Sequence, residues 1–159
     1  MAPLYLEDFA VGQTYGTGRL RVDAEAIKAF AAAFDPQPFH LDDDAARASF
    51  FQGLSASGWH TAALTMRLLV QGDLTPVGGI IGVWAEEMKW PRAVRPGDEL
   101  EVQAEILAVR PSESRPGQGF VKVRSTTLNQ HREPVQVLVM NQHLDGQVLV
   151  MNLLVQARA

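Results

Sequence analysis

The sequence predicts an α+β fold, in which an antiparallel sheet packs against one long helix. Helical periodicity is confined to the first half of the chain, whereas apolar and polar residues alternate in the second half. The most helix-like stretch follows Ser57, runs to Gly72 and is apolar nearly all round. A helix of that kind lies in a core or is enclosed by a sheet. Helices that precede a run of strands favour an α+β arrangement.

Two further helices are expected before the apolar helix. Residues 9–15 form a short extended segment with a turn at Gly12. Asp23 is the natural N-cap of the first helix, which ends before Pro36 because a residue that precedes proline is pushed out of the helical region. A shorter helix is expected over residues 43–49, whose first turn is acidic. The apolar stripe of the first helix consists of Ile27, Phe30, Ala31 and Phe34.

Strands are expected throughout the second half. The clearest covers residues 99–106, where strict alternation indicates a strand with one solvated face. A turn at residues 96–98 precedes this strand, and residues 110–119 form a loop rich in proline, glycine and serine. The other expected strands are 80–90, 120–128, 135–140 and 148–155.

A short tandem repeat lies near the C-terminus. Residues 129–131 recur as 141–143, and residues 136–141 recur as 147–152. We hypothesise that the second copy adds a strand, or that the two copies compete for one position in the sheet.

The composition favours a single domain spanning residues 1–159. Apolar residues make up 47% and charged residues 20% of the chain, a balance that supports a core. The net charge of −4 disfavours a nucleic-acid partner. The N-terminus lacks the pattern of a secretory signal, and no stretch reaches membrane-spanning length. With no cysteine present, we expect a cytoplasmic protein without a membrane partner.

The densest run of groups suited to catalysis lies between Asp35 and His40. Pro36 and Pro38 restrict the intervening backbone to a bent path, so that a carboxylate and an imidazole can meet at one water molecule. Such a pair can take a proton from water and return one elsewhere, because imidazole titrates near neutrality. The alternative is a plain proline-rich turn with His40 on the surface. No metal site is expected, since no second histidine lies at ligand spacing.

A second candidate site is the start of the apolar helix at Ser57 and Gly58. The first turn of any helix leaves backbone N–H groups without intrahelical partners, and glycine lets a ligand approach them closely. This helix start could therefore stabilise an oxyanion. Ordinary capping by Ser57 is the simpler interpretation, and the two are compatible.

These motifs, in this order, resemble the MaoC-like dehydratases, the family of (R)-specific enoyl-CoA hydratases. The resemblance covers about residues 5–155 and rests on five features. They are Gly12-Gln13, the helix with Phe30-Ala31, the run Asp35-x-x-Pro38-x-His40-x-Asp42, Ala56-x-Gly58 and Pro96-Gly97-Asp98.

The resemblance implies a hot-dog fold, in which a curved antiparallel sheet wraps a long central helix, and a homodimer or higher homo-oligomer. It implies that Asp35 and His40 activate the water that adds to a trans-2-enoyl-CoA thioester. The backbone N–H of Gly58 would hold the thioester oxygen, and no cofactor or metal would be needed. The residues expected to contact the substrate are Ser57, Trp59, Phe39 and Met66.

Two departures from the family pattern concern substrate shape. Many relatives have histidine where this chain has Ser57, and some have serine where this chain has Met66. The backbone donor at Gly58 survives both changes, but Trp59 and Met66 are expected to narrow the acyl pocket.

Three other functions remain open. A branched or dicarboxylic acyl substrate, as in mesaconyl-CoA-type hydratases, fits the same motifs. A thioesterase would need a carboxylate on the central helix, and the segment from Gly58 to Gly72 contains none. A non-catalytic subunit that binds acyl thioesters is also possible, although such a subunit has no chemical need for both Asp35 and His40.

Overall fold

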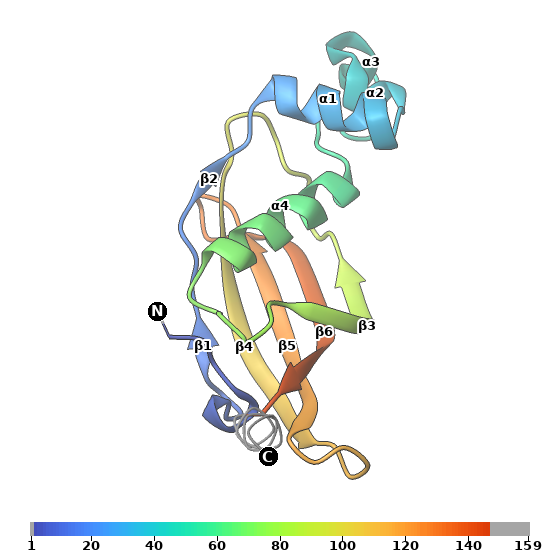
Figure 1. Cartoon of the computed structure of the whole chain (residues 1–159). Helices are drawn as coiled ribbons and strands as arrows, with labels where there is room; N and C mark the ends of the chain where they lie inside the picture. The colour runs from blue at the N-terminus through green and yellow to red at the C-terminus, as the bar shows by residue number, and fades with distance from the viewer. Residues whose placement is uncertain (1, 147–159) are drawn as a thin grey trace.

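A computed structural model describes residues 2–146 of the chain. In this range an antiparallel sheet with the strand order β1-β4-β5-β6-β3, in which β2 also pairs with β4, curves around helix α4 (Figure 1). The predicted α+β class and hot-dog fold are confirmed. The strands are β1 (Thr14–Tyr15), β2 (Leu20–Arg21), β3 (Ile81–Lys89), β4 (Glu99–Pro111), β5 (Gln118–Leu128) and β6 (Pro134–Asp145). The helices are the 3-10 turn η1 (Leu6–Asp8), α1 (Ala24–Phe34), α2 (Pro38–Leu41), α3 (Asp43–Arg47) and α4 (Gly58–Gln71).

Alternation along β4 places one row of side chains in the core. These buried residues are Leu100, Val102, Ala104 and Ile106. Val102 pairs with Thr127 of β5, and Thr127 pairs with Gln136 of β6, so these positions share the face beneath α4. The strand expected over residues 99–106 continues to Pro111 because a register shift after Ile106 breaks the alternation but not the pairing.

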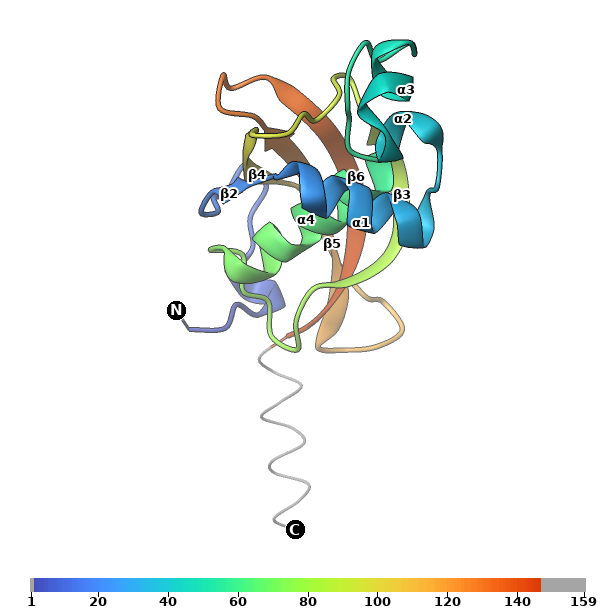
Figure 2. The ribbon, with the colours of Figure 1, turned by 90° about the horizontal axis from the view of Figure 1, so that it is seen from above.

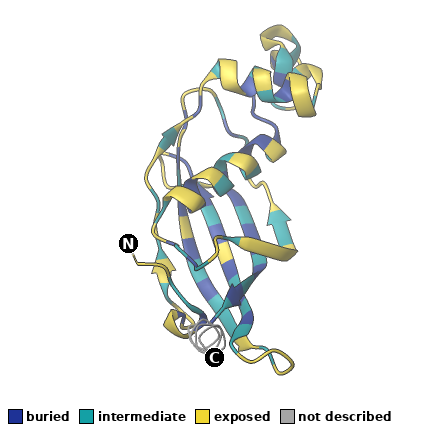
Figure 3. Ribbon diagram, viewed as in Figure 1, coloured by how far each residue is buried: buried dark blue, intermediate teal, exposed yellow. Residues whose placement is uncertain are grey.

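Helix α4 packs only one face against the sheet. Leu68 and Leu69 are buried, whereas Trp59 and Val70 are exposed. The ribbon of α4 accordingly carries both buried and exposed stretches (Figure 3). The prediction that the sheet wraps this helix is confirmed, although within the described residues the helix also has an exposed side. Its solvent-facing side includes small residues such as Ala63, and these raised the apolar content of the sequence without filling a core.

The helices α1, α2 and α3 form a group at the N-terminal end of α4, beyond the end of the sheet (Figures 1 and 2). As predicted, Asp23 caps α1, because its side chain accepts a hydrogen bond from the Ala26 N–H at 2.7 Å. The proline-rich turn after α1 contains a helical turn that the sequence did not predict. Pro38 begins α2, where its missing N–H costs nothing and its fixed φ suits a helix.

Some sequence predictions lie outside the described residues. The expected strand at residues 148–155 and the repeated segment at residues 147–152 both fall beyond residue 146. The other copies that follow residue 134, residues 136–141 and 141–143, lie within β6. Of the helices within residues 2–146, none has the length and apolar character required to cross a membrane.

Candidate active site

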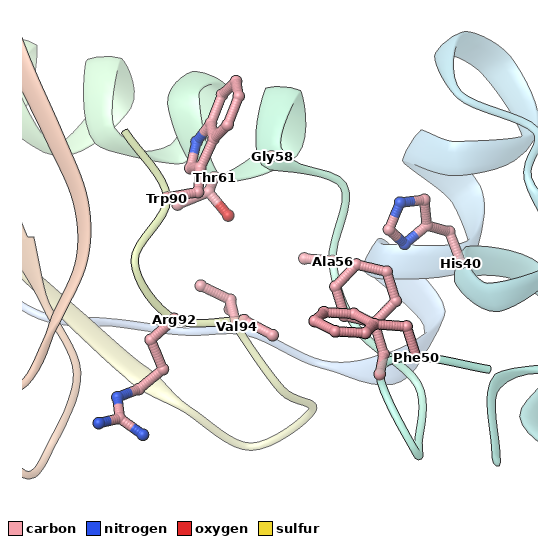
Figure 4. A pocket seen from close by; sticks show the side chains of 10 residues that line it. His40, Phe50, Ala56, Gly58, Thr61, Trp90, Arg92 and Val94 are labelled. Atoms are coloured by element: carbon pink, nitrogen blue, oxygen red, sulfur yellow. The ribbon is translucent and has the colours of Figure 1, made fainter. Parts of the chain in front are cut away.

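A pocket of about 320 Å³ lies between the α1–α3 group, the start of α4 and the chain segment that leads into β4 (Figure 4). His40 and Gly58, two of the predicted catalytic residues, both line it. Aromatic and aliphatic side chains supply most of the remaining wall, and one cationic side chain is present. These other residues are Phe50, Phe51, Ala56, Thr61, Trp90, Arg92, Ala93 and Val94.

The bend between α1 and α2 brings Asp35 and His40 together. Asp35 is the C-cap of α1, and its carbonyl accepts a hydrogen bond from the Gln37 N–H at 2.7 Å. His40 follows within the single turn of α2. The His40 Nε2 atom lies 3.5 Å from Asp35 Oδ2. His40 is buried, whereas 18% of the Asp35 side chain remains exposed, so the carboxylate forms the more solvated end of the pair.

A backbone carbonyl fixes the tautomer of His40. The His40 Nδ1 atom lies 2.7 Å from the Ser55 carbonyl oxygen. Because a carbonyl oxygen can only accept, Nδ1 carries a hydrogen and donates it. In the neutral ring, Nε2 therefore presents a lone pair on the side of Asp35. A lone pair and a carboxylate repel each other unless a proton or a water molecule lies between them, so this geometry favours water binding at the pair.

Hydrogen bonds keep Asp35 ionised. Desolvation is the largest single influence on the pKa of Asp35 and raises it, but hydrogen bonds from Ser57 and Gln37 and the charge of His40 outweigh it. The pKa of Asp35 consequently lies below its ordinary value. The Gln37 amide donates at 2.6 Å. The Ser57 hydroxyl also accepts from the Trp59 N–H at 3.2 Å, which ties Asp35 to the start of α4.

Gly58 is the first residue of α4, so its N–H has no acceptor within the helix. The indole of Trp90 lies directly against it. A Cβ atom at position 58 would come within 2.7 Å of Trp90 Cε2, closer than atoms can pack. Glycine is therefore required by this contact as well as by the access that a ligand needs to the N–H.

Arg95 holds the loop that forms one side of the pocket. Its guanidinium donates to the carbonyl oxygens of Phe51 at 2.5 Å and of Gly53 at 2.8 Å. This loop leads directly into Ser55, whose carbonyl orients His40. Nothing in the local sequence around Arg95 indicates a contact with residues about forty positions earlier.

Comparisons with known proteins identify the family of this chain. The family model described as "MaoC like domain" matches residues 8–129. The chain belongs to the MaoC-like dehydratase family. A crystal structure of a MaoC-like dehydratase from Rhodospirillum rubrum is 54% identical, with a TM-score of 0.88 over 91% of this chain and 98% of that one.

Two less similar proteins extend the comparison. The uncharacterized protein YdeM of Bacillus subtilis is 33% identical over 79% of this chain and 87% of its own length. An (R)-hydratase from A. caviae involved in PHA biosynthesis shares the fold. It is 24% identical, with a TM-score of 0.67 over 86% of this chain and 97% of that one. Family membership supports a hydratase or dehydratase activity.

The predicted substrate contacts of this MaoC-like chain are distributed unevenly. Ser57 is buried and its side chain is hydrogen-bonded to Asp35. The ring of Phe39 packs edge-on against the His40 ring, with the two centroids 4.6 Å apart. None of these four residues, Met66 included, is among those that line the pocket, and Trp59 is 59% exposed with its ring against Trp90. Besides His40, Ala56 and Gly58, the pocket wall comes from segments that no local motif marked.

Metal binding finds no ready site in this part of the molecule. Within residues 2–146, no group of three or more histidine, aspartate or glutamate side chains lies close enough together to hold an ion.

Proposed function

We propose that this protein adds water to trans-2-enoyl-CoA thioesters to give (3R)-hydroxyacyl-CoA, or catalyses the reverse dehydration. One observation carries the proposal: His40 Nε2 lies 3.5 Å from Asp35 Oδ2, beside a pocket that the N–H at the start of α4 also reaches. The family, and the (R)-hydratase among the structural relatives, are consistent with this reaction.

The residues divide the work as follows. The Asp35 carboxylate accepts a hydrogen bond from the water, while His40 Nε2 takes a proton from it as the water oxygen bonds to C3 of the enoyl group. The electron pair of the C2=C3 bond moves toward the thioester oxygen, where the Gly58 N–H stabilises the developing charge. The Nε2–H of the imidazolium then delivers its proton to C2. One group takes and returns the proton, so both additions occur on the same face of the double bond.

The proposal is tested with a panel of trans-2-enoyl-CoA thioesters that differ in length and branching. Chiral analysis of the 3-hydroxyacyl product should give the (3R) form. Release of free CoA without hydration would favour a thioesterase. Binding without turnover of any thioester in either direction would favour a non-catalytic subunit.

We further propose that the protein forms a homodimer through β3. Ile81, Val83 and Trp84 are exposed on this strand, which is the last of its sheet. An apolar strand edge of this kind is suited to pairing with another chain. Light scattering should give a dimer mass for the wild type and a monomer mass for Val83→Lys. Val11→Lys, at an exposed valine outside the strands, is the matched control and should stay dimeric.

A further inference from the structure

The wall of the pocket beside Gly58 is set by Trp90 and by a buried chain of hydrogen bonds. The Trp90 Nε1–H donates to Gln136 Oε1 at 2.8 Å. Gln136 lies on β6, is fully buried and donates through Nε2 to Thr65 Oγ1 at 3.1 Å. Thr65, on the sheet-facing side of α4, lies 2.6 Å from the hydroxyl of Thr127.

The direction of every bond in this chain is determined. The Thr65 hydroxyl donates to the Thr61 carbonyl at 2.9 Å, because that oxygen can only accept. Thr65 Oγ1 must then accept from both Thr127 and Gln136. From the other end, the indole N–H can only donate, so the amide oxygen of Gln136 must face Trp90. The bonds to Trp90 and to Thr65 therefore require the same orientation of the Gln136 amide. Only one position of the indole keeps its hydrogen bond to that amide oxygen.

The indole held in this way restricts the space beside the site of the thioester oxygen. The indole of Trp90 lies against the backbone of Gly58. The ring of Trp59 packs nearly perpendicular to this indole, and the two ring centroids are 5.3 Å apart. The pocket volume of about 320 Å³ is at the low end for small-molecule sites and must also admit the thioester and a water molecule.

We propose that Trp90 is a specificity-determining residue that restricts this enzyme to short-chain acyl thioesters, and that Gln136 is the positioning residue that holds Trp90 in place. This inference rests on the proposed function, because it concerns the substrate of that reaction. Its test is independent of turnover, because chain-length selection can be measured by binding alone. Neither residue takes part in proton transfer.

The first experiment measures binding by calorimetry, with butyryl-CoA and octanoyl-CoA as unreactive probes. Wild type should prefer butyryl-CoA. Trp90→Leu and Gln136→Leu should both shift the ratio of the two affinities toward octanoyl-CoA by about tenfold or more, the scale of adding space for methylene groups in an apolar pocket. Thr127→Val is the matched control: it removes one buried hydroxyl of the same chain and leaves the bond between Gln136 and Trp90, so the ratio should stay at the wild-type value.

Trp90→Phe isolates the hydrogen bond from the ring. It keeps an aromatic wall but cannot donate to Gln136, so its selectivity should shift in the same direction as that of Gln136→Leu. The double variant Trp90→Phe/Gln136→Leu should shift the affinity ratio no further than either single variant, because both changes break the same hydrogen bond.

A second experiment compares hydration of crotonyl-CoA and trans-2-octenoyl-CoA in the same variants. The kcat/KM ratio should follow the binding ratio. Wild type that binds both probes equally, or a Gln136→Leu protein that is folded by circular dichroism and keeps the wild-type ratio, would overturn the inference. Loss of turnover with an intact binding preference would instead count against the proposed function alone.

Discussion

The sheet and the segment that carries the acid–base pair are held in place by different kinds of contact. Strands β4, β5 and β6 pair along their length, and their inward side chains fill one core. Residues 35–58 have no strand pairing and contribute only a few side chains to that core. Individual bonds, such as those from Arg95 to the loop and from His40 to Ser55, hold the rest of the segment. The comparison teaches that stability comes from the repetitive part of the molecule and chemistry from the irregular part.

The largest expected effect separates these two properties at the acid–base pair. Asp35→Asn and His40→Gln should each lower turnover by about 10²–10⁴-fold, the usual loss when a positioned acid–base group is removed. The fold should stay intact, because the paired strands and the apolar core do not depend on either side chain, and only the local bonds of the segment are lost. Steady-state kinetics with thermal melts on the same samples check both statements. Near wild-type turnover in either variant would remove that residue from the mechanism.

The opposite behaviour is expected in the sheet. Ile106 is fully buried on the face that packs against α4. Ile106→Ala should reduce the free energy of unfolding by about 2–5 kcal/mol, since it removes buried methyl groups and leaves a cavity. Below the melting transition, kcat should stay close to the wild-type value. A variant of normal stability but low kcat would contradict the separation of the two regions.

Arg95 connects the two regions, so its loss should affect kcat more than the fold. Arg95→Lys keeps the charge, but a single ammonium cannot span carbonyl groups on both Phe51 and Gly53. We expect kcat to fall by about tenfold or more, because a small shift of the loop misplaces His40. Arg124→Lys is the control, since Arg124 pairs with Glu105 on the surface and does not line the pocket. Equal losses in both variants would argue against a positioning role.

The smallest effect concerns stability at acidic pH. His60 is buried against Phe30, and desolvation lowers its pKa, with Asp23 partly opposing the shift. Below about pH 6.5 the imidazole of His60 binds a proton in the unfolded chain, whereas in the folded protein it stays neutral until the pH is lower. The free energy of unfolding should therefore decrease as pH falls through the window between the unfolded and the folded pKa.

His60→Phe should reduce that loss of stability between pH 7 and pH 5.5, as measured by urea unfolding. His131→Gln, at an exposed histidine, is the control and should follow the wild-type curve. An unchanged pH dependence in His60→Phe would assign the acid sensitivity to other groups.

Much of the fold could be predicted because its signals are local. The alternation in β4 and the cap at Asp23 are visible in a few adjacent residues, and both are present in the structure. The extent of β4 was not predictable, because a bulge preserves pairing while it disrupts the pattern. The α2 turn was missed because four residues carry no periodicity, and a proline that starts a helix looks the same as one that ends a helix.

In the candidate site, too, residues that are close in the sequence could be predicted and residues that are far apart could not. Asp35 and His40 lie within one short segment, so their proximity could be expected from the bend that the prolines impose. Trp90 and Gln136 reach the site from separate parts of the chain. Their partnership exists only after the sheet has formed, and no spacing in the sequence encodes it.

The contact between Gly58 and Trp90 also has an evolutionary consequence. A methyl group at position 58 would overlap the indole, so a larger residue is tolerated there only after position 90 has become smaller. Mutations at these two sites are therefore epistatic, and their order matters. A lineage could widen the acyl site by changing Trp90 first, whereas the reverse order would pass through an intermediate with a steric clash. Descendants of this chain should consequently lose the tryptophan before they lose the glycine.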